Sequence, residues 1–234
     1  MADGVTMDGR IPRWATWAFG VPAVAFFVGL ALDLDGLRLA TKPVPVLVLA
    51  LVVLMARPRL RYRTLIGVGL VFGATGDLLL ELGHFVPGLL AFLVGHLWYL
   101  TALWGLDRRL SPWTAAPFAV WGIGLTVALA EGAGELLLPV GVYAAVLCTA
   151  MWRGGSLLGA DIPRSAALAT FVGLVAFGFS DSLIAIDRFG AEVPAGRWVI
   201  MLSYWAAQAL VALGSLALDD DRRVPDVDSS AAPA

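Results

Sequence analysis

The sequence predicts an all-α protein, a polytopic membrane bundle of eight transmembrane helices. Three observations predict this class. First, 59% of the 234 residues are hydrophobic and 15% are charged, whereas about 25% of the residues in a soluble domain are charged. Second, the mean hydropathy is +0.83. Third, the apolar residues fall into segments of about 20 residues, the length at which a helix crosses a bilayer.

Eight such segments follow one another with short connections between them. They cover residues 14–32, 43–56, 63–82, 87–106, 112–131, 134–153, 165–187 and 194–217. The second segment is the shortest, with Pro43 at its start and Arg57 directly after its end. We therefore expect a single eight-helix transmembrane domain over residues 1–218. Residues 219–234 are too polar to join a core, and we expect a disordered cytoplasmic tail there.

The basic residues predict the orientation of these helices. If each segment crosses the membrane once, 12 of the 16 Lys and Arg residues lie on one side, namely Arg10, Arg13, Arg57, Arg59, Arg61, Arg63, Arg108, Arg109, Arg153, Arg164, Arg222 and Arg223. The other side holds Arg38, Lys42, Arg188 and Arg197. Basic loops stay in the cytoplasm. We therefore expect a multi-pass protein of the plasma (inner) membrane with both termini cytoplasmic.

Two carboxylates lie inside these apolar segments. Asp77 precedes the outer end of the third helix by about five residues, and Asp181 precedes that of the seventh by about six, so both lie roughly 8–9 Å below the outer helix ends. A charged residue at the centre of a membrane helix costs roughly 2.5–3.5 kcal/mol, so it faces the bundle interior and marks a functional site. Asp77 and Asp181 are therefore our candidate catalytic residues.

Other polar side chains occur at similar depths on neighbouring helices. We predict that they line the same outward-biased polar cavity and bind substrate; they are Lys42, Glu81, His96, Tyr143, Tyr204 and Gln208. Tyr143 and Tyr204 are more easily explained as hydrogen-bond partners of the carboxylates than as reacting groups. Glu81 is at the water boundary, where a solvated charge at a helix end is the simpler interpretation.

Each polar group also has a purely structural explanation. Asp77 and Asp181 each need a partner such as Lys42, a tyrosine hydroxyl or the backbone, and such a bond by itself locks helix packing. His96 fits a helix-packing role as well as a functional one. Gly69, Gly73 and Gly76 leave one side of the third helix small, which permits close approach of a neighbouring helix.

A short internal similarity predicts a duplication. "FGATGDLLLELGHF" and "FGFSDSLIAIDRF" both place a small residue before Asp and a Phe eight residues after it, at Phe85 and Phe189. Four helices in each half would make the two repeats parallel, related by an axis along the membrane normal. Such an axis would bring Asp77 and Asp181 together.

Two carboxyl groups in one low-dielectric pocket do not both ionise easily, which supplies an acid and a base side by side. At this depth they suit a hydrolase that acts on a lipid bond just below the headgroup. A serine hydrolase is disfavoured because no Gly-x-Ser-x-Gly motif is present. Zinc needs three protein ligands, and His96 is the one inward histidine beside the two carboxylates. Cys148, the single cysteine, provides no disulfide or metal site. We expect no metal and no cofactor.

Six segments in this order resemble the YhhN-like, lysoplasmalogenase-type family of integral membrane proteins. They are "TKPVPVLVL" from Thr41, "FGATGDLLL" from Phe72, "LLAFLVGHLWYL" from Leu89, "PVGVYAAVLCTAM" from Pro139, "FGFSDSLIAIDRF" from Phe177 and "MLSYWAAQALVALG" from Met201. The resemblance implies an eight-helix hydrolase that cleaves the vinyl ether bond of a lysolipid to a fatty aldehyde and a glycerophospho-alcohol. It also implies that Asp77 and Asp181 are the acidic pair of the site.

The expected partners are a lysophospholipid or ether-lipid substrate and the lipid bilayer. The net charge of −2, without a basic block, excludes nucleic acid as a partner. Two other classes stay open on the sequence alone. One is a lipid or proton-coupled transporter that uses the two Asp residues as a proton relay. The other is a non-catalytic protein whose polar residues serve packing.

Overall fold

The computed structural model describes residues 11–109 and 112–218, and the regular structure in these ranges is all helical. The elements are α1 (Arg13–Ala31), α2 (Asp35–Thr41), α3 (Val44–Met55), α4 (Arg61–Glu81), α5 (Phe85–Leu106), α6 (Ala116–Ala128), α7 (Ala130–Ala133), α8 (Leu137–Ser156), α9 (Arg164–Phe189) and α10 (Gly196–Ala217), with three short 3-10 helices at Pro112–Ala115, Gly134–Leu136 and Leu157–Gly159. The predicted tail over 219–234 lies outside the described residues.

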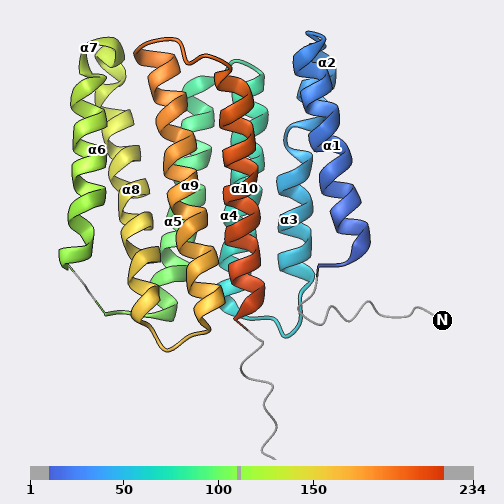
Figure 1. Cartoon of the computed structure of the whole chain (residues 1–234), viewed down its shortest axis with the longest axis vertical. Helices are drawn as coiled ribbons and strands as arrows, with labels where there is room; N and C mark the ends of the chain where they lie inside the picture. Colours follow the sequence, from blue (N-terminus) through green and yellow to red (C-terminus); the bar gives the residue numbers. More distant parts are fainter. Residues whose placement is uncertain (1–10, 110–111, 219–234) are drawn as a thin grey trace, which may run out of the picture.

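Within the described ranges, seven helical stretches are long and apolar enough to cross a membrane. This confirms a polytopic helical membrane bundle. The segment predicted over 112–131 differs from the others, because α6 has 13 residues and is flanked by a 3-10 turn and the short α7. It nevertheless stands alongside α8 as one more upright helix (Figure 1).

The second predicted segment begins too late. The chain is already helical from Asp35, and α2 and α3 together form one span of 21 residues, Asp35–Met55. Pro43 lies at the break between the two helices, where it precedes the first residue of α3. The apolar pattern missed α2 because three charged residues (Asp35, Arg38 and Lys42) interrupt it within eight positions.

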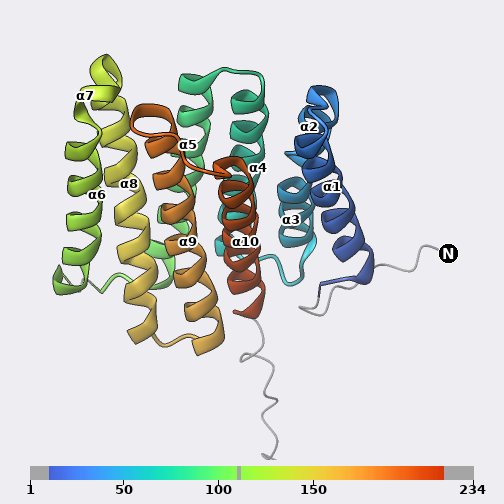
Figure 2. The same ribbon diagram turned by 45° about the horizontal axis from the view of Figure 1, so that its top comes forward.

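The helices stand in a row that is two layers deep at its centre (Figure 1, and Figure 2 from a tilted direction). From one edge the order is α6, α8, then α9 in front of α5, then α10 in front of α4, then α3 and α1. If α1, α3, α4 and α5 correspond to α6, α8, α9 and α10, the helix contacts of one half recur in the other. The α1–α3 contact matches α6–α8, the α3–α4 contact matches α8–α9, and the α3–α10 contact matches α8–α5. This pairing is what two parallel four-helix repeats predict, and Phe85 and Phe189 meet edge to face at 5.5 Å.

The two ends of the bundle differ in their connections. One end, which we call the site end, carries α2, α7 and the α4–α5 and α9–α10 connections (Figure 1). The other, the arginine-rich end, carries the start of α1, the end of α10 and the connections that hold Arg57, Arg59, Arg108 and Arg109, with Arg61 and Arg164 as the first residues of α4 and α9. Both described termini thus lie at the same end, as expected from the sequence.

Two arginines at the arginine-rich end are buried and bind the ends of neighbouring helices. Arg63 is 1% exposed and donates hydrogen bonds to the carbonyls of Ser215 at 3.1 Å and Leu216 at 3.0 Å, in the last turn of α10. Arg153 is fully buried and donates to the carbonyls of Asp107 and Arg109, just after α5. The last four carbonyls of a helix lack partners within it. The guanidinium group of Arg63 supplies partners for two such carbonyls of α10, whereas Arg153 binds the chain that directly follows α5.

Replacement of Arg63 by Leu should destabilise the bundle. The substitution leaves the two buried α10 carbonyls unpaired, at a cost of about 1–3 kcal/mol for each orphaned group. Arg61→Leu is the matched control, because Arg61 lies in the same helix turn but is exposed. We expect thermal unfolding in detergent to show a lower midpoint for Arg63→Leu and an unchanged midpoint for Arg61→Leu. Equal midpoints would contradict the capping role.

Candidate active site

A chain of hydrogen bonds holds Asp77 inside the bundle. Tyr99 on α5 donates to Gln208 Oε1 at 2.7 Å, Gln208 Nε2 donates to the Tyr204 hydroxyl at 3.2 Å, and Tyr204 donates to Asp77 Oδ2 at 2.9 Å. The four side chains come from α5, α10 and α4, and each is 1–3% exposed. The chain therefore fixes three helices around one carboxylate.

Glycine on α4 makes room for this chain. A Cβ atom at Gly73 would lie 2.7 Å from Gln208 Nε2 and 3.2 Å from the Tyr204 hydroxyl. One turn closer to the site end, a Cβ atom at Gly76 would lie 2.6 Å from the Phe92 ring. The small side of the third helix predicted from the sequence is thus the side against which the polar side chains and Phe92 pack.

Asp181 on α9 has a tyrosine partner of its own. The Tyr143 hydroxyl on α8 donates to Asp181 Oδ2. Asp181 and Tyr143 both line two small cavities of about 40 Å³ each, one toward α6 and the other toward α4 and α5. A cavity of this size next to a carboxylate is large enough for water. Asp77, by contrast, is 2% exposed and lies behind Phe92, which lines the second cavity.

Aromatic rings connect the two tyrosine–aspartate pairs. Phe177 lies 5.3 Å from the Tyr204 ring and 4.4 Å from the His96 ring, and His96 lies 5.7 Å from the Tyr143 ring. His96 Nδ1 is 2.9 Å from the carbonyl of Phe92, which assigns the N–H to that nitrogen. Its Nε2 is buried and has no hydrogen-bond partner among the described residues. The site therefore contains an unpaired acceptor between its two carboxylates.

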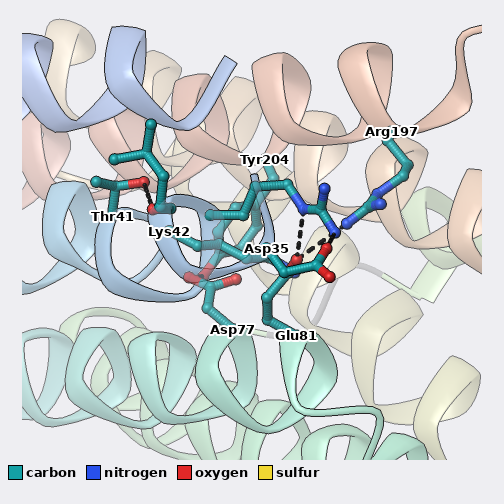
Figure 3. A network of polar contacts seen from close by, with 9 residues as sticks. Asp35, Thr41, Lys42, Asp77, Glu81, Arg197 and Tyr204 are labelled. Atoms are coloured by element: carbon teal, nitrogen blue, oxygen red, sulfur yellow. Dashed lines mark hydrogen bonds and ion pairs between the residues drawn. The ribbon is translucent and has the colours of Figure 1, made fainter. Parts of the chain in front are cut away.

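Glu81 is the centre of an ion cluster at the site end of the bundle (Figure 3). Its carboxylate accepts hydrogen bonds from Arg38 at 3.0 Å, Lys42 at 3.1 Å and Arg197 at 3.0 Å. Its side chain is 6% exposed. The interpretation of Glu81 as a solvated charge at a helix end is therefore wrong. Figure 3 shows Asp77 and Glu81 on one face of α4, with Lys42 and Tyr204 above Asp77.

The remaining charged residues near the site end do lie at the water boundary. His84, Asp187 and Arg188 are exposed. Asp187 accepts a hydrogen bond from the backbone of Val193 at 3.0 Å, and Arg188 lies over the Phe85 ring. Within residues 11–109 and 112–218, no three His, Cys, Asp or Glu side chains are grouped closely enough to hold a metal ion.

The sequence reasoning missed several side chains of this site, and some of them had a detectable signal. Tyr99 comes three residues after His96, and Arg38 comes four residues before Lys42, so each shares a helix face with a residue already selected. Phe92 and Phe177 had no such signal, because they are ordinary apolar residues of membrane helices. Arg197 was assigned to the same side as Arg38 and Lys42, and the structure places the three at one end, but nothing in its sequence neighbourhood pointed to Glu81.

The fold and the site define a class: a helical membrane protein with one buried and one partly buried tyrosine–aspartate pair inside its bundle and an ion cluster at one end. The sequence model of the YhhN family matches residues 37–215. This chain belongs to the YhhN family.

Three relatives show the range of the similarity. Lysoplasmalogenase TMEM86A of Homo sapiens is 38% identical over 65% of this chain and 65% of its own length. Lysoplasmalogenase TMEM86B of Homo sapiens is 33% identical over 75% of this chain and 74% of its own length. A lysoplasmalogenase of Mycobacterium bovis is 34% identical over 95% of this chain and 87% of its own length. The match thus spans just under two thirds of the TMEM86A chain and most of the mycobacterial one. No solved structure matches this chain significantly.

Neutralising Glu81 should destabilise the protein. Glu81→Gln leaves three basic side chains without their counter-charge, and a hydrogen bond to a charged group contributes about 1.5–3 kcal/mol. Glu135→Gln is the control, since Glu135 is an exposed carboxylate near the same end of the bundle. We expect a lower thermal midpoint in detergent for Glu81→Gln alone. If both variants unfold together with the wild type, the ion cluster does not stabilise the fold.

Proposed function

We propose that this protein is a membrane-embedded hydrolase that cleaves the vinyl ether bond of a lysolipid and releases a fatty aldehyde and a glycerophospho-alcohol. One observation carries the proposal: Asp181, hydrogen-bonded to Tyr143, lines cavities inside the bundle of a chain whose relatives bear the name lysoplasmalogenase. The same names favour hydrolysis over the transport alternative.

A buried carboxyl group suits this reaction because the first step is proton transfer to carbon. A carboxyl group in a site of low dielectric keeps its proton more readily than one in water. Protonation of the alkene carbon that is not bonded to oxygen gives an oxocarbenium ion. Water then adds to the carbon that bears the oxygen, and the resulting hemiacetal collapses to the aldehyde and the free alcohol. The water supplies one hydrogen to the alcohol and replaces the proton used in the first step, so the enzyme is regenerated.

We assign the proton transfer to Asp181, because it lines the cavities where substrate and water can lie. Tyr143 binds Oδ2, so Oδ1 is the oxygen that we propose faces the substrate and carries the proton. Once Asp181 has given up its proton, its carboxylate accepts one from the attacking water. One group then serves as acid and base in turn.

Asp77 is the second carboxylate in our proposal, and we assign it an electrostatic role. Figure 3 shows Lys42 above Asp77, on the side of the ion cluster around Glu81. In its ionised form, Asp77 would stabilise the oxocarbenium ion through a medium of low dielectric, where charges act over longer distances than in water. The hydrogen bond from Tyr204 keeps this carboxylate oriented.

We assign the remaining predicted substrate-binding residues to two parts of the lysolipid, its headgroup and its free hydroxyl. The cluster around Glu81 holds three basic groups, of which Arg197 is half exposed. We propose that Arg197 receives the headgroup phosphate while Lys42 and Glu81 hold Arg197 in position. His96 Nε2 is a buried acceptor without a partner among the described residues. We propose that it binds the free hydroxyl of the lysolipid, which would remove the cost of burying an unpaired polar atom.

Asparagine substitution tests the two carboxylates. We expect Asp181→Asn to reduce aldehyde release from a lysoplasmalogen by about 10²–10⁴-fold, the range for loss of a general acid. Asp77→Asn should also lose most of its activity, by about 10²-fold, because it removes a stabilising charge. Asp187→Asn is the matched control on α9, where the carboxylate is exposed. Wild-type rates in both buried variants, with the fold intact, would overturn the assignment.

An isotope experiment tests the route of the reaction. In D₂O, protonation at carbon places one deuterium on the carbon next to the aldehyde carbonyl. We expect mass spectrometry of the trapped aldehyde to show this single deuterium. An aldehyde without deuterium at that carbon would contradict protonation as the first step.

We further propose that the arginine-rich end of the bundle faces the cytoplasm and that the protein resides in the plasma membrane. The distribution of Arg and Lys supports this orientation. A reporter enzyme that is active only outside the cytoplasm, fused after residue 218, should stay inactive. The same reporter placed in the α9–α10 connection should be active, and the reverse pattern would contradict the proposal.

A further inference from the structure

A groove of about 440 Å³ runs between α6 and α8, on the side of the bundle that would face lipid. This is within the usual size range of small-molecule sites. Its lining is mostly small or apolar and includes Ala119, Gly122, Gly141, Ala144, Ala145 and Cys148. A side chain at Gly122 would collide with Cys148, since its Cβ atom would lie 2.6 Å from Sγ. Small residues thus keep this space open.

The groove adjoins the cavity that Asp181 lines. Gly122, Thr126, Ala144 and Cys148 line both the groove and the cavity between α6, α8 and α9. That cavity in turn shares Asp181 and Tyr143 with the one toward α4 and α5. The side chains between the lipid-facing groove and the carboxyl group of Asp181 are therefore few, and the four that line both spaces are small.

The corresponding helix pair of the other half, α1 and α3, borders a smaller space. A cavity of about 170 Å³ lies between α1, α3 and α10, and its lining includes Phe19 and Leu49. Phe26 and Phe27 on α1 pack against Trp205 on α10 at 5.4 and 5.6 Å, and Phe27 stacks on Trp198 at 4.9 Å. The two halves therefore differ, since the wider space of about 440 Å³ lies between α6 and α8.

We propose that the α6–α8 groove receives the hydrocarbon chain of the lysolipid, with the chain entering from the bilayer between these helices. This inference rests on the proposed function, and it adds a subsite that selects the substrate by its chain. The groove offers no gain in hydrophobic free energy, because lipid tails are as apolar as the groove lining. Its role is to position: a chain held in the groove brings its first carbons, which carry the vinyl ether, to Asp181.

A direct binding experiment tests the groove without requiring activity. Wild-type protein in bilayers is irradiated with a lysolipid that carries a diazirine near the end of its chain, and the labelled peptides are identified by mass spectrometry. We expect labelling of residues 115–152, reduced by an excess of the same lysolipid without the diazirine. Competable labelling confined to α1, α3 or α10, or labelling that the competitor leaves unchanged, would overturn the proposal.

Two adjacent substitutions on α6 provide the matched variants. Ala119 lines the groove, whereas Val120 is 72% exposed and points away from it. Ala119→Trp should fill the groove, abolish the competable labelling and lower kcat/KM for a long-chain lysoplasmalogen by about 10- to 100-fold, the cost of a misplaced substrate. Val120→Trp should keep wild-type behaviour. Ala145→Trp, from the α8 side of the groove, should reproduce the effect of Ala119→Trp.

The outcomes separate the groove from the reaction. If the wild type releases aldehyde and both groove variants match Val120→Trp in rate and labelling, the groove proposal fails and the proposed function stands. If the wild type releases no aldehyde but shows labelling that Ala119→Trp abolishes, the groove binds a lipid chain and the proposed reaction is wrong.

Discussion

The burial of Asp77 is the constraint on which the rest of the bundle depends. A carboxylate inside a membrane-spanning helix needs partners from the protein, because the surrounding lipid offers none. Tyr204, Gln208 and Tyr99 meet this need in sequence, and each link joins a different pair of helices or adjacent turns. Because the packing of α4 against α5 and α10 is fixed by directional bonds rather than by apolar contact alone, the position of Asp77 is set within a narrow range. A site that moves protons or charge needs that precision.

Depth along the membrane normal is the property of this site that the sequence reveals best. Most of the spans, and the tyrosines as hydrogen-bond partners of Asp77 and Asp181, follow from the count of residues from a helix end. Lateral contacts do not follow in this way. Glu81 looked solvated because it ends a helix, and only the approach of α2 and α10 surrounds it with Arg38 and Arg197. The helix α2 was missed for the same reason, since its charges are acceptable in a membrane protein only when a partner such as Glu81 lies beside them.

The matching helix contacts of the two halves fit the predicted duplication, and the differences between the halves explain why the two carboxylates are not equivalent. Asp77 is bound from the last helix of the other half, through Tyr204 on α10, whereas Asp181 is bound from within its own half, through Tyr143 on α8. His96 on α5 bonds to its own backbone instead of a carboxylate. The first carboxylate is consequently enclosed, while the second is left beside open volume.

This asymmetry suits a reaction whose two steps need different surroundings. Protonation of an alkene carbon creates a cation, which a fixed negative charge in a medium of low dielectric stabilises most strongly when water is excluded. Capture of that cation needs a water molecule at the other face of the reacting carbon. A single open cavity with two exposed carboxylates would solvate both charges and weaken the first effect. In the proposed reaction, the enclosed Asp77 would supply the charge and Asp181 would act beside the small cavities that can hold water. Phe92, which packs against Tyr204 and Phe177, lines one of these cavities.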